Sequence, residues 1–148
     1  MVPDLTMRGQ DDPHGRAIIA RPPTVGQLAA RLHDLAVSPR RWWNLVEFDA
    51  ARPVPLRLDG LDGARVWLTT WPPGHRTTVH DHAEPGVSTL VAGELAEVVI
   101  TSEGVTERPL RANRIRVHGR RTHAFANPGP AYAISLHGML TAQGSALS

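Results

Sequence analysis

Two histidines separated by one residue are the part of this sequence best suited to chemistry. His80 and His82 end the stretch Gly74-His-Arg-Thr-Thr-Val-His-Asp-His. If this stretch is a strand, the two imidazoles project from the same face, because side chains two apart in a strand point the same way. Imidazole is the commonest protein ligand for zinc, iron, copper and nickel, but a pair needs at least one more donor. His123, in the stretch that ends at Asn127, is the best candidate for that donor.

The composition excludes several other kinds of site. The 148 residues contain no cysteine, so disulfides, thiolate ligands and cysteine nucleophiles cannot occur. All 16 basic residues are arginine, which explains how a net charge of only +2 accompanies a sequence pI near 10.3. Since little titrates between histidine and arginine, the high pI is not an indication of nucleic-acid binding. We therefore expect no nucleic-acid partner.

Length and hydropathy indicate one globular unit. A chain of this length holds a single core, and no run approaches the ~18 apolar residues that would span a bilayer. The N-terminus, with charged residues such as Asp4, Arg8 and Asp11, lacks the apolar centre of a secretion signal. We expect a cytoplasmic protein without membrane contact, either a monomer or a homodimer.

The first part of the chain predicts an arm followed by a helical segment. Residues 1–23 contain many prolines and glycines and no sustained period, so we expect a flexible arm before a single domain at 24–148. Thr24 can cap a helix over 27–36, with leucines on one face at spacings of four and three. A second short helix is expected at Ser38-Pro39, which gives a helical segment over about 24–47.

The remainder, from about 56 to 140, has the pattern of a small β-protein. Short runs rich in strand-forming residues are separated by turn residues; these runs are 65–71, 77–80, 87–91, 95–101, 114–117, 122–125 and 132–139. Regularly spaced short strands after a helical start indicate a mainly β fold, a small antiparallel sandwich or barrel.

Several of these residues carry a family resemblance. Gly74, His80, His82 and Gly93 are spaced as in the first cupin motif, and His123 with Asn127 resembles the end of the second. The longer stretches 71–82, 90–95 and 133–137, together with the helical segment 38–48, resemble the cysteine dioxygenase family of thiol dioxygenases, particularly its bacterial members. The resemblance covers about 24–140 and implies a cupin-type jelly-roll barrel with an N-terminal helical segment.

The resemblance also implies a metal and a reaction. Fe(II) is expected to be held by His80, His82 and His123, while the glutamate that joins such ligands in ordinary cupins is replaced at about Gly86. Three neutral imidazoles leave the 2+ charge of the iron uncompensated, which favours an anionic donor such as a thiolate, and leave positions open for substrate and O2. The implied activity is oxidation of a small carboxylated thiol, cysteine or a related compound, to its sulfinate. We expect the other histidines, His118 among them, to be structural.

Five further residues follow from the resemblance as substrate or catalytic candidates. Arg57 aligns with the arginine that binds the substrate carboxylate, a role that suits a guanidinium fork, although Arg52 is the nearest rival. Trp71 is expected to line the pocket. An ordinary salt-bridged role for Arg57 is the alternative.

The last strand contributes Ser135, His137 and Met139 to one face. The family has a serine, histidine and tyrosine relay here, so methionine removes a hydroxyl beside the metal. A larger or more apolar thiol, or a different oxidation, suits such a pocket better. For Ser135 and His137 a purely structural hydrogen bond is an equally open interpretation.

Two other functions remain open from the sequence. A three-histidine cupin can use its metal as a Lewis acid in hydrolysis, isomerisation or lyase chemistry, with zinc or nickel. A cupin can also bind a small ligand without turnover, because a fold does not define a function.

Overall fold

One α-helix and nine β-strands make up the described part of the chain. The computed structural model describes residues 21–59, 61–77, 80–81, 84–119 and 122–141. The helix α1 (Val25–Ala36) is followed by two short 3₁₀ turns at Pro39–Arg41 and Trp43–Leu45. The strands are β1 (Val54–Leu58), β2 (Ala64–Trp71), β3 (His80–Asp81), β4 (Gly86–Ala92), β5 (Ala96–Thr101), β6 (Gly104–Pro109), β7 (Arg116–His118), β8 (Thr122–Ala126) and β9 (Ala133–Leu140).

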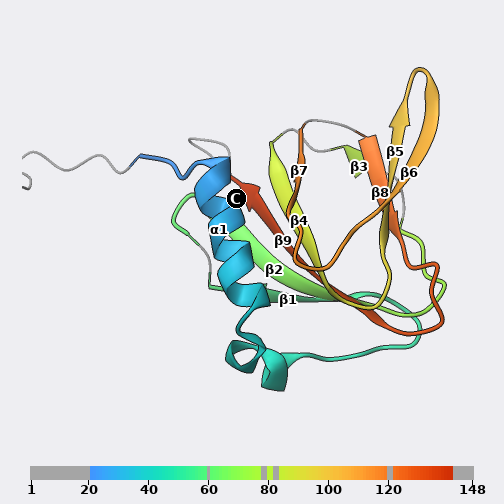
Figure 1. Cartoon of the computed structure of the whole chain (residues 1–148), viewed down its shortest axis with the longest axis horizontal. Helices are drawn as coiled ribbons and strands as arrows, with labels where there is room; N and C mark the ends of the chain where they lie inside the picture. The colour runs from blue at the N-terminus through green and yellow to red at the C-terminus, as the bar shows by residue number, and fades with distance from the viewer. Residues whose placement is uncertain (1–20, 60, 78–79, 82–83, 120–121, 142–148) are drawn as a thin grey trace, which may run out of the picture.

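The strands form two sheets, and all pairings between these strands are antiparallel. One sheet has the order β1-β2-β9-β4-β7 and the other the order β3-β8-β5-β6. Strands distant in sequence are therefore neighbours, such as β2 with β9 and β5 with β8. Figure 1 shows α1 against the five-stranded sheet and the four-stranded sheet on the far side of it. This arrangement confirms the mainly β, antiparallel fold expected from the sequence.

The helix forms where the sequence predicts it and for the predicted reason. The Thr24 side chain accepts a hydrogen bond from the Gln27 backbone N–H at 3.1 Å, and the Gln27 side chain accepts one from the Thr24 backbone at 2.9 Å. This capping box satisfies two N–H groups at the start of the helix. Three leucines one turn apart, Leu28, Leu32 and Leu35, are buried against β9 and its neighbours, and burial of each contributes about 1.5–3 kcal/mol.

The second short helix expected from Ser38 forms as two 3₁₀ turns rather than as one continuous helix. Ser38 makes no side-chain cap. The break lies at Trp42, whose φ of −138° is outside the helical range. Its side chain is 1% exposed, and the indole N–H donates to the carbonyl of Leu35 at 2.8 Å. Burial of the indole under α1 outweighs the local helical preference. Of the arm predicted at 1–23, residues 1–20 lie outside the described residues.

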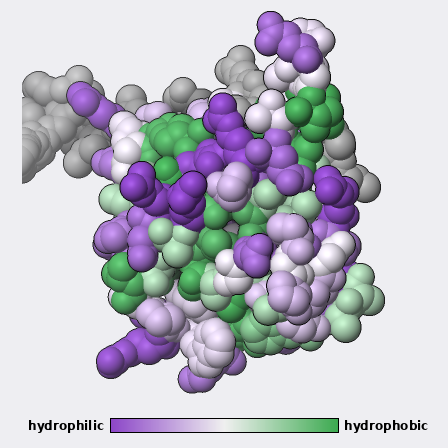
Figure 2. Space-filling model, turned by 45° about the vertical axis from the view of Figure 1, so that its right-hand side comes forward, coloured by the Kyte–Doolittle hydropathy of each residue, from purple (hydrophilic) through white to green (hydrophobic). Residues whose placement is uncertain are grey.

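The helix α1 is short and partly polar, and the surface of the molecule is mixed in hydropathy. α1 has 12 residues, and no helix among the described residues is long and apolar enough to cross a bilayer. Hydrophilic residues are spread over the face shown in Figure 2, with hydrophobic residues in smaller groups among them.

Gly138 on β9 allows α1 to approach the sheet closely. A Cβ at this position would lie 2.7 Å from Leu28 Cδ1 and 2.9 Å from Leu28 Cγ. Both distances are shorter than van der Waals contact, so the helix or its leucines would have to move.

We therefore expect Gly138→Ala to lower the free energy of unfolding by about 1–3 kcal/mol through overpacking. Gly26→Ala is the matched control: within α1 its Cβ meets no atom closer than 3.8 Å, and it should raise the free energy of unfolding by up to about 1 kcal/mol. Urea unfolding of both variants measures the two changes. A Gly138→Ala protein as stable as the wild type would show that the helix is not packed at this distance.

Candidate metal centre and cavity

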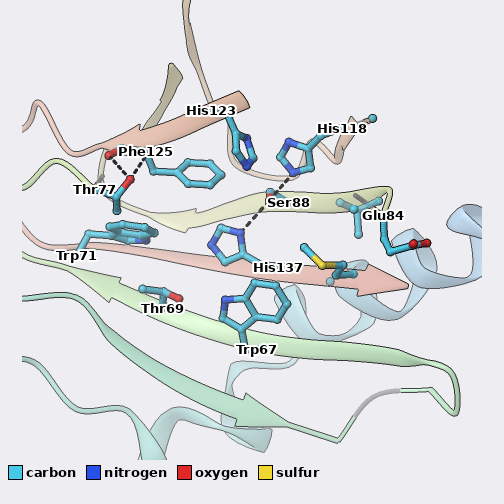
Figure 3. A pocket seen from close by; sticks show the side chains of 15 residues that line it. Trp67, Thr69, Trp71, Thr77, Glu84, Ser88, His118, His123, Phe125 and His137 are labelled. Carbon is cyan, nitrogen blue, oxygen red and sulfur yellow. Dashed lines mark hydrogen bonds between the residues drawn. The ribbon is translucent and has the colours of Figure 1, made fainter. Parts of the chain in front are cut away.

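A cavity of about 160 Å³ lies between the two sheets. Its walls are largely apolar and aromatic, with three histidines gathered around Ser88, as Figure 3 shows. A space of this size, lined by aromatic residues and a few polar groups, suits a small ligand. The described residues that line it are Trp67, Thr69, Trp71, Thr77, Glu84, Gly86, Val87, Ser88, His118, Gly119, His123, Phe125, His137, Gly138 and Met139.

His123 and His118 share one buried carboxylate behind the cavity wall. Glu97 Oε2 lies 2.8 Å from His123 Nδ1 and 3.0 Å from His118 Nδ1. Glu97 is 0% exposed, and the three residues have ligand-type atoms within 4.8 Å of one another. Imidazole and carboxylate groups at this spacing make a group able to take part in metal binding.

Glu97 is held in its ionised form by its neighbours. Burial alone would raise the pKa of this carboxyl group, but hydrogen bonds from His118 and His123, and electrostatic attraction to the same side chains, hold it well below its usual range. Arg116 Nη1 also lies 3.5 Å from Glu97 Oε1. An ionised carboxylate only accepts hydrogen bonds, so each Nδ1 atom that contacts it carries a proton.

The strand register places two of the three predicted metal ligands next to each other. β3 pairs with β8 so that the Cα atom of His80 is the partner of the Cα atom of His123. His82, the third predicted ligand, lies outside the described residues. Of the predicted ligands, His123 suits a metal, because with its proton on Nδ1 it carries a lone pair on Nε2, the form in which imidazole binds a metal.

A second cluster of polar side chains lies on strands β9 and β4. Ser135 Oγ hydrogen-bonds His137 Nε2 and accepts a hydrogen bond from Trp71 Nε1 at 2.7 Å. Ser88 Oγ lies 2.8 Å from His137 Nδ1 and 2.8 Å from His118 Nε2, as the dashed lines in Figure 3 mark. The structure thus brings Ser135 and His137 together, as predicted for the last strand. Ser135 is 0% exposed and His137 is 4% exposed.

The predicted substrate residues lie in two different settings. Trp71 and Met139 line the cavity. Arg57 is exposed on β1 opposite Trp67, so it shares the cavity-facing side of the sheet, but it is not among the described lining residues. Arg52 is an exposed residue that precedes β1.

Gly86 occupies a position where a side chain has no room. It is opposite Met139 across β4 and β9, and a Cβ on it would lie 2.9 Å from the carbonyl oxygen of Gly138. The position at which the resemblance implies a lost glutamate ligand is therefore closed to any larger residue unless these strands separate.

Sequence reasoning missed Glu97, His118 and Ser88. One local signal was present for Glu97, since it is the only charged residue in the apolar run of β5. An acid in a buried strand is rare unless it is paired. His118 and Ser88 had no comparable signal, because their contacts depend on the pairing of β4 with β7 and β9.

Comparisons with known proteins agree on the fold. An oxalate oxidase in complex with the substrate analogue glycolate has a TM-score of 0.56 at 17% identity, and the alignment covers 66% of this chain and 56% of that one. A cupin superfamily protein from Desulfitobacterium hafniense DCB-2 gives 0.56 at 15% identity, with 66% and 85% coverage. A cupin domain from Bordetella pertussis Tohama I gives 0.53 at 19% identity, with 65% and 100% coverage.

A family match extends over most of the chain. Residues 17–143 match the family Cysteine dioxygenase type I. The comparison with curated proteins gave no match. The match covers the helix, both sheets and the histidines of the cavity, and the chain belongs to the cysteine dioxygenase type I family, with the fold of a cupin.

Proposed function

We propose that this protein is an Fe(II)-dependent thiol dioxygenase that converts a small carboxylated thiol to its sulfinate with O2. The observation that carries the proposal is His123, which lines the cavity, stands opposite His80 in the register and donates through Nδ1 to an ionised carboxylate. Membership of the cysteine dioxygenase type I family supports an oxidoreductase reaction at this site.

The proposed ligands are His80, His82 and His123. Ferrous iron bound there supplies the site at which a thiolate and O2 meet. The overall reaction places both oxygen atoms of O2 on sulfur and releases one proton, so it consumes one thiol and one O2 for each sulfinate. Glu97 orients His123 from behind, and Gly86 keeps a fourth protein ligand away from that position.

The cavity walls keep water from the reacting groups. Trp67, Trp71 and Phe125 form an aromatic wall, and exclusion of water strengthens every electrostatic interaction inside. His137 lines the same cavity and is bonded to Ser135, so this pair is the candidate for orienting the bound thiol.

Charge and size suggest the class of thiol. Arg57 is on the cavity-facing side of the sheet and is the proposed partner of a substrate carboxylate. Met139 adds an apolar wall in place of a hydroxyl group. These two residues favour a short thiol with a carboxylate at one end and an alkyl part that contacts the thioether.

The ligand set can be tested by loss of iron. We expect His80→Ala and His123→Ala each to retain at least about 10-fold less iron after anaerobic reconstitution and desalting, while His33→Ala, on the exposed side of α1, retains the wild-type amount. Stoichiometric iron in either cavity variant contradicts the proposed ligands. Loss of iron in His118→Ala but not in His80→Ala would point to Glu97, His118 and His123 instead.

The reaction can be tested with an oxygen electrode. We expect the iron-loaded protein to consume O2 in the presence of cysteine or 3-mercaptopropionate and to form one sulfinate for each O2, detected by mass spectrometry. The same protein reconstituted with zinc is the control and should consume none. Iron-replete protein that leaves a panel of carboxylated thiols unchanged would overturn the proposed function in favour of Lewis-acid chemistry or simple ligand binding.

The carboxylate partner can be tested separately. Loss of a charge-assisted bidentate hydrogen bond costs about 10-fold or more in binding, so Arg57→Gln should raise KM for cysteine by that factor. Arg52→Gln is the matched control and should leave KM unchanged. For cysteamine, which has no carboxylate, both variants should behave as the wild type. A cysteine KM that changes only in Arg52→Gln would identify the other arginine.

A further inference from the structure

One buried chain of hydrogen bonds connects the two polar groups of the cavity. It runs from β2 through β9, β4 and β7 to β5 and β8, with every member at most 8% exposed. In order, the chain is Trp71, Ser135, His137, Ser88, His118, Glu97 and His123. Figure 3 shows its centre, where Ser88 lies between His137 and His118.

The two ends of the chain allow only one direction of donation. The indole Nε1–H of Trp71 can only donate, and it donates to Ser135. At the other end, Glu97 Oε2 contacts the Nδ1 atoms of both His118 and His123, and the Arg116 guanidinium lies 3.5 Å from Oε1, so the carboxylate accepts from both rings. Between these ends, each hydroxyl has one proton and each neutral imidazole has one.

From the Trp71 end, the protons of the first three groups follow in sequence. Ser135 accepts from Trp71, and within the described residues its remaining hydrogen-bond contact is His137 Nε2, so its own proton points there. A neutral His137 that accepts at Nε2 carries its proton on Nδ1. This proton is donated to Ser88 at 2.8 Å.

From Ser88 onward the same direction continues to the carboxylate. Ser88 accepts from His137 and donates to His118 Nε2 at 2.8 Å. His118 therefore holds its proton on Nδ1, which is the atom that contacts Glu97. The two derivations meet without conflict, since the Glu97 end independently requires a proton on the same nitrogen.

We propose that Ser88 and Glu97 are positioning residues that hold His137, His118 and His123 in one tautomer, with the proton on Nδ1. His123 then carries its lone pair on Nε2, and His137 is fixed relative to the cavity from β4 as well as β9. The metal consequence rests on the proposed function, but the tautomers themselves do not.

A rival arrangement has Glu97, His118 and His123 bind the metal directly. In that case the metal displaces the proton from each Nδ1 atom when it binds. In the positioning arrangement both Nδ1 protons remain when the metal is bound, because they are donated to Glu97.

Histidine ring resonances distinguish these arrangements. Long-range proton–nitrogen correlation of protein labelled with nitrogen-15 in its histidines reports which ring nitrogen carries the proton. We expect His118, His123 and His137 to show the Nδ1–H form in metal-free protein, and His118 and His123 to keep it after loading with diamagnetic zinc. Protonation of His137 at Nε2, or loss of the Nδ1 protons on zinc binding, overturns the proposal.

Two serine and threonine variants on β4 separate positioning from packing. Ser88→Ala removes the bridging hydroxyl, so His137 should lose its single-tautomer pattern and show both forms or a shifted one. Thr89→Val is the matched control: its hydroxyl is equally buried on the neighbouring position but bonds the carbonyl of Arg114 at 2.8 Å. Unchanged histidine tautomers in Ser88→Ala, or equal changes in both variants, contradict the role of Ser88.

Glu97→Gln tests the other positioning residue through metal affinity. Zinc affinity should fall about 10–100-fold, while Glu94→Gln, an exposed acid in the turn before β5, should leave it unchanged. Equal affinities in all three proteins would overturn the role of Glu97. If Glu97→Gln does not fold, the histidine tautomers measured in the wild-type protein test the role of Glu97 instead. If the protein shows these tautomers but oxidises no thiol, the inference stands and the proposed function is wrong. If it oxidises thiols but shows other tautomers, the proposed function stands and the inference is wrong.

Discussion

The buried carboxylate of Glu97 is the constraint on which the rest of the cavity depends. An ionised carboxylate away from water costs several kcal/mol unless it is paired and hydrogen-bonded, and here His118, His123 and Arg116 provide the compensation. Glu97 and His123 belong to the four-stranded sheet, whereas His118 and Arg116 come from β7 of the five-stranded sheet. The charge therefore ties the two sheets together at the side of the cavity where the histidines gather. Separation of the sheets here would leave an uncompensated charge in the interior.

The alternation of β9 serves the core and the cavity at once. Ile134 and Leu136 are buried in the cluster under α1, while Ser135 and His137, one position along, belong to the hydrogen-bonded chain of the cavity. A register shift by one residue would exchange these faces, placing a histidine against the leucines of the helix and an aliphatic side chain in the cavity. Packing of α1 and the geometry of the cavity are consequently fixed by the same pairing with β2 and β4.

The sequence could predict those features of the fold that local patterns determine. The cap at Thr24 and the leucine spacing determined α1, and the alternating short runs indicated the sheets. The second helix is broken at Trp42 because its indole is buried under α1. This is a tertiary contact, and local helix preference does not predict it. Glu97, His118 and Ser88 escaped for a related reason. They are far apart along the chain and come together only because strands that are not consecutive in sequence pair with each other. Their spacing in the sequence therefore does not predict the cluster.

The hydrogen-bonded chain also gives a physical account of methionine at position 139. His137 is bonded at Nε2 to Ser135 on its own strand and at Nδ1 to Ser88 on β4, and its ring stacks on Trp67 at 5.5 Å between centroids. Two hydrogen bonds and one stacked face already define the orientation of the imidazole, so no hydroxyl at position 139 is needed to hold it. The opposite position, Gly86, has no space for a side chain, and the thioether remains as an apolar part of the wall. The thioether also meets one charged group, because Arg65 Nη2 lies 3.6 Å from the sulfur of Met139.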